Sequence, residues 1–542
     1  MSTMTIRGGA VAAKPQNDRL VVFASSLGTV FEWYDFYIYG TLGAILAGKF
    51  FSGVAPASAF IFTLLAFAAG FAVRPFGALV FGRLGDLVGR KYTFLVTMTL
   101  MGFGTFLIGV LPSYATWGIA APILLIVLRL VQGLALGGEY GGAATYVAEH
   151  APNGKRGLYT SWIQTTATLG LFMALLIILG IRTAMGEEAF NEWGWRIPFL
   201  LSVVLLGVSV WIRLQLAESP AFQKMKDEGK QSKAPLTEAF GNWANGKIAI
   251  LALLGATAGE AVVWYGGQFY ALFFLTQTIK VPAVQAQIMI VIALALATPG
   301  FIFFGWLSDK IGRKPIMMAG FLLAVVTYFP LFQGLTHFAN PALERALAES
   351  PVTVVADPKG CSFQLKLTGT ESYTTPCDVA KSTLVTRSVN YTNAEAAAGA
   401  PVTVKVGNET LTAGTPTFVK ELNDAITKHG YPASANPAQI NYPMTVLLLF
   451  ILVVYVTMVY GPIAAWLVEL FPTRIRYTGM SLPYHIGNGW FGGFLPATVF
   501  AIVAATGNIY SGLWYPIIIA AMSFIVALIF LPETKDRDIH RI

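Results

Sequence analysis

Long apolar stretches, separated by short polar segments, run through most of this 542-residue chain. A helix needs about 20 apolar residues to cross the hydrocarbon core of a bilayer, so the pattern predicts membrane-spanning helices. Twelve spans are expected, at residues 20–48, 57–81, 92–112, 118–148, 159–181, 195–217, 248–279, 284–304, 315–337, 442–468, 479–506 and 511–531.

The composition agrees with this pattern. The chain is 55% hydrophobic and 12% charged, whereas soluble globular proteins carry about 25% charged residues. The first 19 residues are polar and lack a short apolar core followed by a cleavage site, so no cleavable signal peptide is expected. We therefore expect an all-α, multi-pass protein that is surrounded by a lipid bilayer.

The basic residues predict the orientation of the chain. With the N-terminus inside, the inner loops and tails hold 21 of the 36 Lys and Arg residues, and the short outer loops hold four. This bias follows the positive-inside rule. Both termini are therefore expected to be cytoplasmic. The net charge of +8 is explained by topology and does not indicate a nucleic-acid partner.

Three landmarks occur twice along the chain, in the same order. They are a G-x-x-x-D-x-x-G-R-K motif at residues 82–91 and 305–314, a Glu seven residues before an Arg (Glu149 and Arg156, Glu469 and Arg476), and an L-x-E-[ST] segment at residues 216–219 and 531–534. Internal duplication of a membrane chain is typical of transporters.

The two halves differ by one insertion. The interval from Asp86 to Glu149 is 63 residues, whereas the interval from Asp309 to Glu469 is 160 residues. The additional residues fall on the outer side of the predicted topology. The expected segments are a tail (1–19), a six-helix bundle (20–217), an inner loop (218–247), three helices (248–337), the insertion (338–441), three more helices (442–532) and a tail (533–542).

The insertion contains both cysteines of the chain, Cys361 and Cys377. An oxidising outer compartment favours a disulfide between them, and two free thiols are the alternative. Alternating or β-branched segments at 352–355, 363–367 and 402–406 predict a small, partly β domain. Its role is open between a lid over the outer vestibule and a module that binds an extracytoplasmic partner.

Two acids in the first span are candidates for proton coupling. Charged groups inside a bilayer cost about 3 kcal/mol or more each, so they usually face a cavity or each other. Glu32 and Asp35 lie three residues apart and share one helix face. Carboxylates this close repel each other, and one of them can hold a proton near working pH. The alternative is that they form structural ion pairs with Arg74 or Arg129.

Two arginines are candidates for binding a carboxylate, because arginine offers a fixed fork of donors. Arg129 lies about 15 Å along the helix axis from Glu139, so the two are not expected to pair. It therefore needs a substrate carboxylate or an acid of the first span. Arg74 precedes Pro75, where a kink is expected. A permanent bridge between arginine and carboxylate is the alternative.

Other in-span polar and aromatic residues widen the candidate set. Glu139 lies among four glycines that permit close helix contact, and it is either a proton relay or an interface group. Glu260 begins a polar and aromatic face of the seventh span. The aromatic residues either line a cavity, where they would suit a quaternary ammonium group, or sit in helix interfaces and membrane belts. The candidates for substrate contact besides the arginines are Tyr37, Glu260, Trp264, Tyr265 and Gln268. His485 titrates near neutral pH in water, but a single histidine is more often a packing residue.

The repeated loops have a mechanical interpretation. We expect their charged residues to latch an inner gate through ion pairs when the inner side is closed, with topology as a second reason for the charges. The candidate gating residues are Asp86, Arg90, Glu149, Arg156, Asp309, Arg313, Glu469 and Arg476.

These motifs resemble the major facilitator superfamily, in which two six-helix bundles flank a central cavity. The resemblance is sharpest at residues 31–40 (F-E-W-Y-D-F-Y-I-Y-G), with further matches at 74–77, 129–133, 137–140, 195–199 and 471–474, and it points to the metabolite:proton symporter family. That family includes transporters for proline and betaine, 2-oxoglutarate, citrate and shikimate. In the first loop copy Leu87 replaces the usual basic residue. The resemblance covers all twelve spans but not the insertion. It implies proton-driven uptake by alternating access through a bacterial cytoplasmic membrane.

The sequence therefore predicts a proton-coupled symporter for a small organic anion. A betaine or proline importer, an exporter, and a receptor that binds ligand without moving it are the alternatives. No enzymatic activity and no cofactor are expected, because the chain has no G-x-x-x-x-G-K-[ST] nucleotide loop and no cluster of metal ligands.

Overall fold

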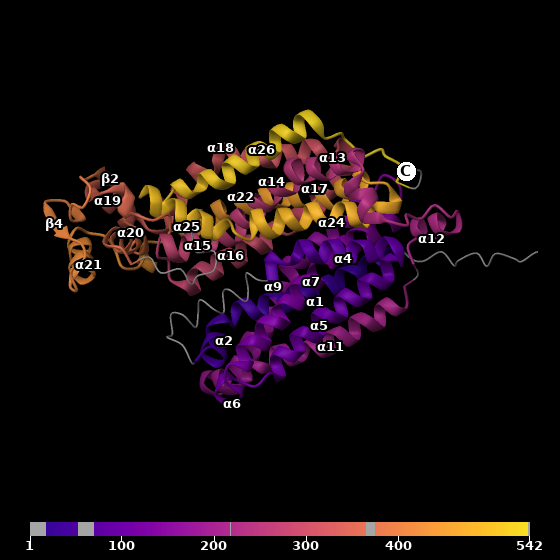
Figure 1. Cartoon of the computed structure of the whole chain (residues 1–542), viewed down its shortest axis with the longest axis horizontal. Coiled ribbons are helices and arrows are strands. Elements are labelled where there is room, and N and C mark those ends of the chain that lie inside the picture. Colours follow the sequence, from indigo (N-terminus) through magenta and orange to yellow (C-terminus); the bar gives the residue numbers. More distant parts are fainter. Residues whose placement is uncertain (1–17, 53–69, 217, 365–373, 540–542) are drawn as a thin grey trace, which may run out of the picture.

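The helices of the computed structural model, which describes residues 18–52, 70–216, 218–364 and 374–539, follow the apolar pattern of the sequence (Figure 1). Within these residues, ten helical stretches are long and apolar enough to cross a membrane. They are Arg90–Val110, Ala120–His150, Arg156–Met185, Arg196–Leu214, Trp243–Thr278, Ala283–Ile311, Arg313–Ala339, Tyr442–Leu470, Thr473–Thr506 and Ser511–Phe530. Each coincides with one predicted span. The first predicted span corresponds to α1 (Asp18–Thr41) and α2 (Gly43–Phe50). The helix α4 (Arg74–Leu87) is part of the second, which begins among residues outside the described ranges. The predicted N-terminal tail also lies largely outside them.

The helices form two bundles that lie side by side in Figure 1, so the predicted fold class is confirmed. The N-terminal bundle continues with α5 (Arg90–Val110), α7 (Ala120–His150), α8 (Arg156–Gln164), α9 (Thr166–Met185) and α11 (Arg196–Leu214). The C-terminal bundle contains α13 (Trp243–Ala252), α14 (Ala258–Tyr265), α15 (Ala271–Phe273), α16 (Ala283–Ala297), α17 (Pro299–Ile311), α18 (Arg313–Ala339), α22 (Tyr442–Tyr460), α23 (Ile463–Leu470), α24 (Arg476–Ile486), α25 (Leu495–Thr506) and α26 (Trp514–Phe530).

Two spans of the C-terminal bundle contain π-helical turns. The seventh span has η3 (Leu253–Thr257), η4 (Gly266–Tyr270) and η5 (Phe274–Thr278), and the eleventh has η9 (Gly487–Gly492). Pro483, inside α24, has no N–H to donate, and the Thr257 hydroxyl of the neighbouring span donates to its carbonyl oxygen at 2.8 Å. π-Turns are frequent at functional sites, and these two spans both face the cavity described below.

Glycines allow the helices to approach closely. A Cβ atom on Gly157 would lie 2.4 Å from the carbonyl oxygen of Gly305, across the boundary between the two bundles. A Cβ atom on Gly137 would lie 2.2 Å from the carbonyl oxygen of Arg74. A side chain at either position is therefore excluded, and the glycines around Glu139 do pack helices together, as predicted.

The insertion folds as a small mixed domain between α18 and α22, at the end of the C-terminal bundle away from the C-terminus (Figure 1). Its sheet has the order β2-β1-β3-β4, with β1 parallel to β2 and the other pairs antiparallel. Its elements are α19 (Pro341–Glu349), β1 (Val352–Ala356), α20 (Pro376–Thr386), β2 (Tyr391–Glu395), β3 (Thr403–Val406), β4 (Glu409–Thr412) and α21 (Phe418–Lys428). The predicted strands at 352–355 and 402–406 are confirmed. The predicted strand at 363–367 extends into residues outside the described ranges.

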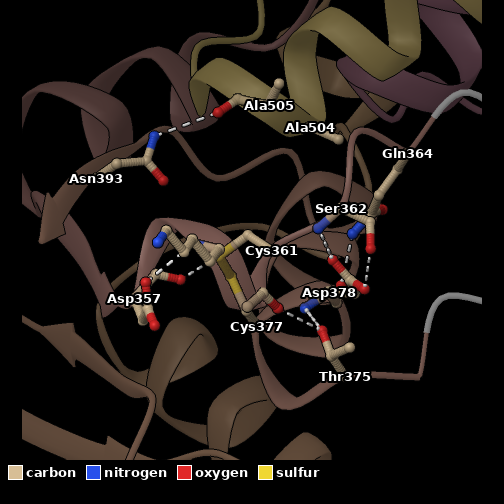
Figure 2. The surroundings of a disulfide bond; sticks show 12 residues. Asp357, Cys361, Ser362, Gln364, Thr375, Cys377, Asp378, Asn393, Ala504 and Ala505 are labelled. Carbon is tan, nitrogen blue, oxygen red and sulfur yellow. Dashed lines mark hydrogen bonds between the residues drawn. A yellow bond between two sulfur atoms is a disulfide. The ribbon is translucent and has the colours of Figure 1, made fainter. Parts of the chain in front are cut away.

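The predicted disulfide between Cys361 and Cys377 is present (Figure 2). Beside it, the Asp378 carboxylate accepts hydrogen bonds from the backbone N–H of Ser362 at 2.7 Å and from its hydroxyl at 2.9 Å. The Thr375 hydroxyl accepts from the backbone N–H of Asp378 and caps α20. These contacts fix the residue after Cys361 to the start of α20.

The insertion is bonded to the C-terminal bundle at two places. The backbone N–H of Tyr391 donates to the carbonyl oxygen of Gly507, just after α25, at 2.7 Å. The Asn393 amide donates to Ala505 at 3.3 Å (Figure 2). The backbone N–H of Ala435 donates to the carbonyl oxygen of Lys280, between the seventh and eighth spans, at 2.8 Å. The insertion therefore links the ends of two cavity-facing spans.

Removing the disulfide, by reduction or by Cys361→Ser with Cys377→Ser, is expected to loosen the insertion and leave the bundles folded. The two cysteines are 16 residues apart, and a crosslink that closes a loop of this length contributes about 3 kcal/mol. Limited proteolysis within 338–441 should therefore become faster while the spans stay protected. An unchanged cleavage rate in the insertion contradicts this expectation.

Candidate functional site

A small cavity lies between the two bundles. Its free volume is about 30 Å³, which is room for one or two water molecules, so the bundles are closed around it. It is lined by Thr29, Glu32, Trp33, Arg74, Leu136, Tyr140, Trp264, Tyr265, Tyr460, Tyr484, His485 and Asn488. We call it the central cavity.

Arg74 is the arginine that lines the central cavity. It is the first residue of α4, between Val73 and Pro75, which lies in the first turn of the helix. Its guanidinium carbon lies 4.2 Å from the ring centre of Phe71, and its charge interacts with the Tyr265 side chain. The side chain is 5% exposed. A buried cation that stacks on aromatic rings retains donors for an anion.

A second cavity, inside the N-terminal bundle, brings the three predicted proton-coupling acids together. Glu32, Asp35 and Glu139 all line it, and Glu32 also lines the central cavity. The Glu32 and Glu139 carboxyl groups are close enough to influence each other electrostatically. We call this second space the acid cavity.

Arg213 is the cation beside these acids, and no role for it was predicted from the sequence. It belongs to α11, is 1% exposed, and interacts electrostatically with both Glu32 and Glu139. Its guanidinium donates to the carbonyl oxygen of Ser25 at 3.3 Å. The only signal in the sequence was its position inside an apolar span.

Asp35 is connected to Arg129 through neutral side chains. Its carboxylate accepts from the Ser202 hydroxyl at 2.6 Å and lies within hydrogen-bonding reach of Thr105. Arg129 donates to Gln132 at 2.8 Å, and Gln132 donates to Thr105 at 2.7 Å. Arg129 also stacks on Tyr39. It is not among the residues that line the central cavity.

Aromatic side chains surround the central cavity on both sides. Trp33 of the N-terminal bundle lies 5.8 Å, between ring centres, from Trp264 of the C-terminal bundle. Tyr140 stacks on Tyr484 across the same boundary at 3.6 Å. Tyr37 lies behind Trp33, on which it stacks at 5.8 Å. Of the predicted substrate-contact residues, Trp264 and Tyr265 line the cavity, whereas Tyr37, Glu260 and Gln268 are not among its lining residues.

The cavity's hydroxyl and amide groups are mostly paired. The Tyr460 and Tyr484 hydroxyls share a hydrogen bond of 2.9 Å, and the Tyr140 hydroxyl accepts from Gln164 at 2.8 Å. Asn488 donates to the buried Glu260 at 3.0 Å. Tyr140, Tyr460, Tyr484 and Asn488 were not predicted, because tyrosine and asparagine in an apolar span carry no distinguishing local pattern.

The repeated Glu and Arg landmarks form ion pairs between the bundles. Arg476 of the C-terminal bundle donates to Glu149 of the N-terminal bundle at 2.7 Å, and Arg156 donates to Glu469 at 2.5 Å. All four side chains are at most 3% exposed. Each Glu therefore pairs with the Arg of the other half of the chain, and the two ion pairs are equivalent in the internal duplication.

The loop acids bind helix starts in the opposite bundle. Asp86 accepts from the backbone N–H of Thr478 at 2.8 Å, and Asp309 accepts from the backbone N–H of Gly157 at 2.8 Å. Each acid also pairs at 2.7 Å with the arginine four residues later, Arg90 or Arg313. Each carboxylate thus satisfies helix N-terminal donors that lack partners within their own helix.

The remaining landmark residues complete these two clusters. Arg313 contacts Glu469 at 3.1 Å, and Arg90 contacts Glu149 at 3.8 Å. The Thr534 hydroxyl donates to Glu469 at 2.6 Å, and the Ser219 hydroxyl donates to Glu149 in the same way. Every predicted gating residue therefore belongs to one of two matching ion clusters, which we call the gate clusters.

The C-terminal segment also bonds to both gate clusters. The carbonyl oxygen of Ile539 accepts from Arg476 at 2.9 Å, and the carbonyl oxygen of Arg537 accepts from Arg156 at 3.3 Å. The Arg537 guanidinium donates to the carbonyl oxygen of Glu469 at 2.8 Å. The Ile539 side chain is fully buried. The segment thus adds contacts to arginines from both halves.

Deleting residues 537–542 is expected to weaken the closed state of the gate clusters. Arg476 and Arg156 each lose one buried acceptor while they keep their carboxylate partners, and a buried donor left unpaired costs about 1–3 kcal/mol. Deleting residues 541–542 alone is the matched control. A cysteine placed at the closed interface should react with maleimide several-fold faster in the longer deletion. Equal rates in both deletions contradict this expectation.

The known proteins that are similar to this chain are transporters. Residues 20–253 and 425–542 match the family described as sugar (and other) transporter. The chain is 35% identical to the shikimate transporter of Escherichia coli over 320 residues, which cover 58% of this chain and 72% of that protein. It is 36% identical to the proline/betaine transporter of Salmonella typhimurium over 58% of this chain and 64% of that protein. It is 34% identical to the alpha-ketoglutarate permease of Escherichia coli over 66% of this chain and 81% of that protein.

Among solved structures, the fold matches a proton:xylose symporter of the major facilitator superfamily, XylE. The TM-score is 0.62, with 15% identity, over 96% of this chain and 98% of that chain. The matched family segments leave out residues 254–424, which contain most of the insertion.

Proposed function

Because the chain belongs to the sugar (and other) transporter family of the major facilitator superfamily, we propose that it is a proton-coupled symporter that imports a small organic carboxylate. Its place would be the cytoplasmic membrane of a bacterium, with both termini inside. The proposal agrees with the sequence prediction in reaction class but assigns the carboxylate to Arg74 first, since Arg129 lies away from the central cavity.

The observation that carries the proposal is the position of Glu32. It lines the central cavity together with Arg74, and it lines the acid cavity together with Asp35 and Glu139. A proton on Glu32 is therefore next to the substrate space on one side and next to further proton acceptors on the other. This is the arrangement that couples substrate binding to protonation.

The coupling follows from electrostatics. With one proton between Glu32 and Glu139, a substrate carboxylate beside Arg74 meets a neutral Glu32 and no repulsion. Once the proton leaves, the Glu32 carboxylate competes with the substrate for Arg74. Release of the proton on the inner side thus promotes release of the substrate, with Arg213 stabilising the ionised acids.

The gate clusters supply the alternation. Their ion pairs and helix caps join the bundles while the end of the molecule that carries the repeated loops is closed. Opening that end requires these bonds to separate and their charges to be hydrated. The cost of breaking them at one end is offset by bonds that form at the other end.

A second candidate is import of a zwitterionic osmolyte, such as betaine or proline. It is favoured by Trp33, Trp264 and Tyr265, whose faces suit a quaternary ammonium group. A carboxylate is common to both classes, so Arg74 has the same role in both.

Arg74→Ala is expected to lower the affinity for a transported carboxylate by about 100-fold, because a buried charge pair is worth 2 kcal/mol or more. Arg74→Lys should recover only part of the lost affinity, since lysine lacks the forked donors. Arg83→Ala, on an exposed position of the same helix, is the control. The assay is uptake of labelled shikimate, 2-oxoglutarate, proline and betaine into proteoliposomes. Unchanged uptake of every substrate in Arg74→Ala overturns the assignment, and saturable binding without uptake supports a receptor instead.

A further inference from the structure

His485 has two buried ring nitrogens without a partner. The residue is 2% exposed, lines the central cavity with Arg74, and makes no hydrogen bond through Nδ1 or Nε2. The indole nitrogen of Trp264, on the neighbouring seventh span of the same bundle, is also buried and unpaired. Buried polar groups in proteins are almost always hydrogen-bonded, so these atoms need an explanation.

The other polar groups of the central cavity do not supply the partners. The Tyr460 and Tyr484 hydroxyls bond to each other, and Asn488 bonds to Glu260. Tyr140 bonds to Gln164. Among the described residues that line the cavity, His485 and Trp264 are therefore the uncharged ones with buried polar atoms that lack a hydrogen-bond partner, beside Nε of Arg74.

We infer that His485 and the Trp264 indole N–H bind an uncharged oxygen group on the substrate, so that the preferred substrate is a carboxylate with an additional hydroxyl or keto oxygen. The inference rests on the proposed function, in which Arg74 holds the carboxylate. A neutral imidazole offers one donor and one acceptor, and an indole offers one donor. A hydroxyl or keto oxygen on the carbon skeleton matches these groups.

This assignment separates the two substrate classes. The methylated ammonium of betaine has no donor or acceptor, so its binding would leave His485 and Trp264 buried and unpaired. A site built to hydrogen-bond an oxygen discriminates strongly against an analogue without it, because the polar groups of the site then lose their partners. When an oxygenated carboxylate is bound, the aromatic rings pack against its carbon skeleton.

The test compares matched ligands with the purified protein in nanodiscs, by calorimetric binding. The probes are shikimate against 1-cyclohexene-1-carboxylate, 2-oxoglutarate against glutarate, and betaine. We expect at least one oxygenated acid to bind about 10- to 100-fold more tightly than its deoxygenated analogue. His485→Phe should bring this ratio close to one, mainly by weakening the oxygenated acid. His485→Gln, which keeps a donor and an acceptor, should restore part of it, and Trp264→Phe should lower it by a smaller factor.

Each outcome is decisive. Equal binding of the paired acids, or a ratio that His485→Phe leaves unchanged, overturns the inference, while loss of carboxylate binding in Arg74→Ala still supports the proposed function. Binding of betaine alone overturns the inference and favours the osmolyte importer. If no probe binds the wild-type protein, the proposed carboxylate site fails together with the inference. Retained binding of the deoxygenated acid shows that His485→Phe is folded.

Discussion

Glu32→Gln is expected to abolish proton-driven accumulation of substrate, with a loss of about 100-fold or more, while exchange of substrate across the membrane stays measurable. Positioned proton transfer typically contributes 10²- to 10⁴-fold, and Glu32 lies between the central cavity and the acid cavity. Glutamine keeps the size and polarity of the side chain but cannot release a proton. Substrate binding and movement therefore remain, and coupling is lost.

The controls for Glu32→Gln define what would contradict this role. Glu188→Gln changes an exposed acid of the short helix α10 (Glu187–Ala189) and should leave accumulation unchanged. Glu139→Gln removes the other member of the carboxyl pair and is expected to have a similar effect to Glu32→Gln. Asp35→Asn is expected to be milder, because Ser202 and Thr105 already hold its carboxylate. Full gradient-driven accumulation in Glu32→Gln contradicts the assignment.

Arg476→Ala is expected to shift the protein strongly away from the closed gate. It leaves Glu149 buried without its 2.7 Å partner, and breaking a buried pair from one side costs about 3–5 kcal/mol. Arg90, at 3.8 Å, compensates only in part. Ser161→Cys gives a reporter, because Ser161 is fully buried against Gly305 of the other bundle. Its reaction with maleimide should become at least ten-fold faster, since the native cysteines are joined in the disulfide.

A matched control and a double variant make this result specific. Arg474→Ala removes a neighbouring arginine that pairs with Glu238 at an exposed position, where ion pairs contribute at most about 1 kcal/mol, so the reporter rate should not change. In the double variant Glu149→Gln with Arg476→Gln, the reporter should react more slowly than in Arg476→Ala alone, because no unpaired charge stays buried. An unchanged rate in Arg476→Ala contradicts the gate assignment.

Periodic and repeated features of this chain could be predicted from the sequence. The spacing of apolar stretches predicts the spans, because the bilayer fixes how many residues a helix needs. The paired cysteines predict the disulfide, and alternation predicts β1 and β3 of the insertion. The recurrence of Asp86 and Asp309 predicts two matching clusters. These features depend on local composition or on order along the chain.

The contacts of the site depend on how helices rotate and pack, which local sequence does not determine. The exchange of partners that gives Arg476 to Glu149 requires the two bundles to be placed against each other. Arg213 reaches Glu32 and Glu139 from a helix far along the chain. Tyr484 lines the central cavity from a span that contains a proline and a π-turn.

The two arginines illustrate the same limit. Depth in the membrane made Arg129 the stronger candidate for binding a carboxylate, because a buried arginine needs an anion or another acceptor. In the structure Arg129 has Gln132 and the ring of Tyr39 as partners, and Arg74 lines the central cavity. Burial alone therefore identifies a residue that needs a partner, but not which partner it has.

The most direct test of proton-coupled carboxylate import is to measure proton and substrate fluxes together in proteoliposomes of the wild-type protein. A labelled oxygenated carboxylate from the panel is added outside, with and without an inward proton gradient. We expect the gradient to drive accumulation above the outside concentration, protons to enter in a fixed ratio to substrate, and a protonophore to abolish accumulation. Entry of substrate that only equilibrates, with no dependence on the gradient and no proton flux, would contradict the proposal.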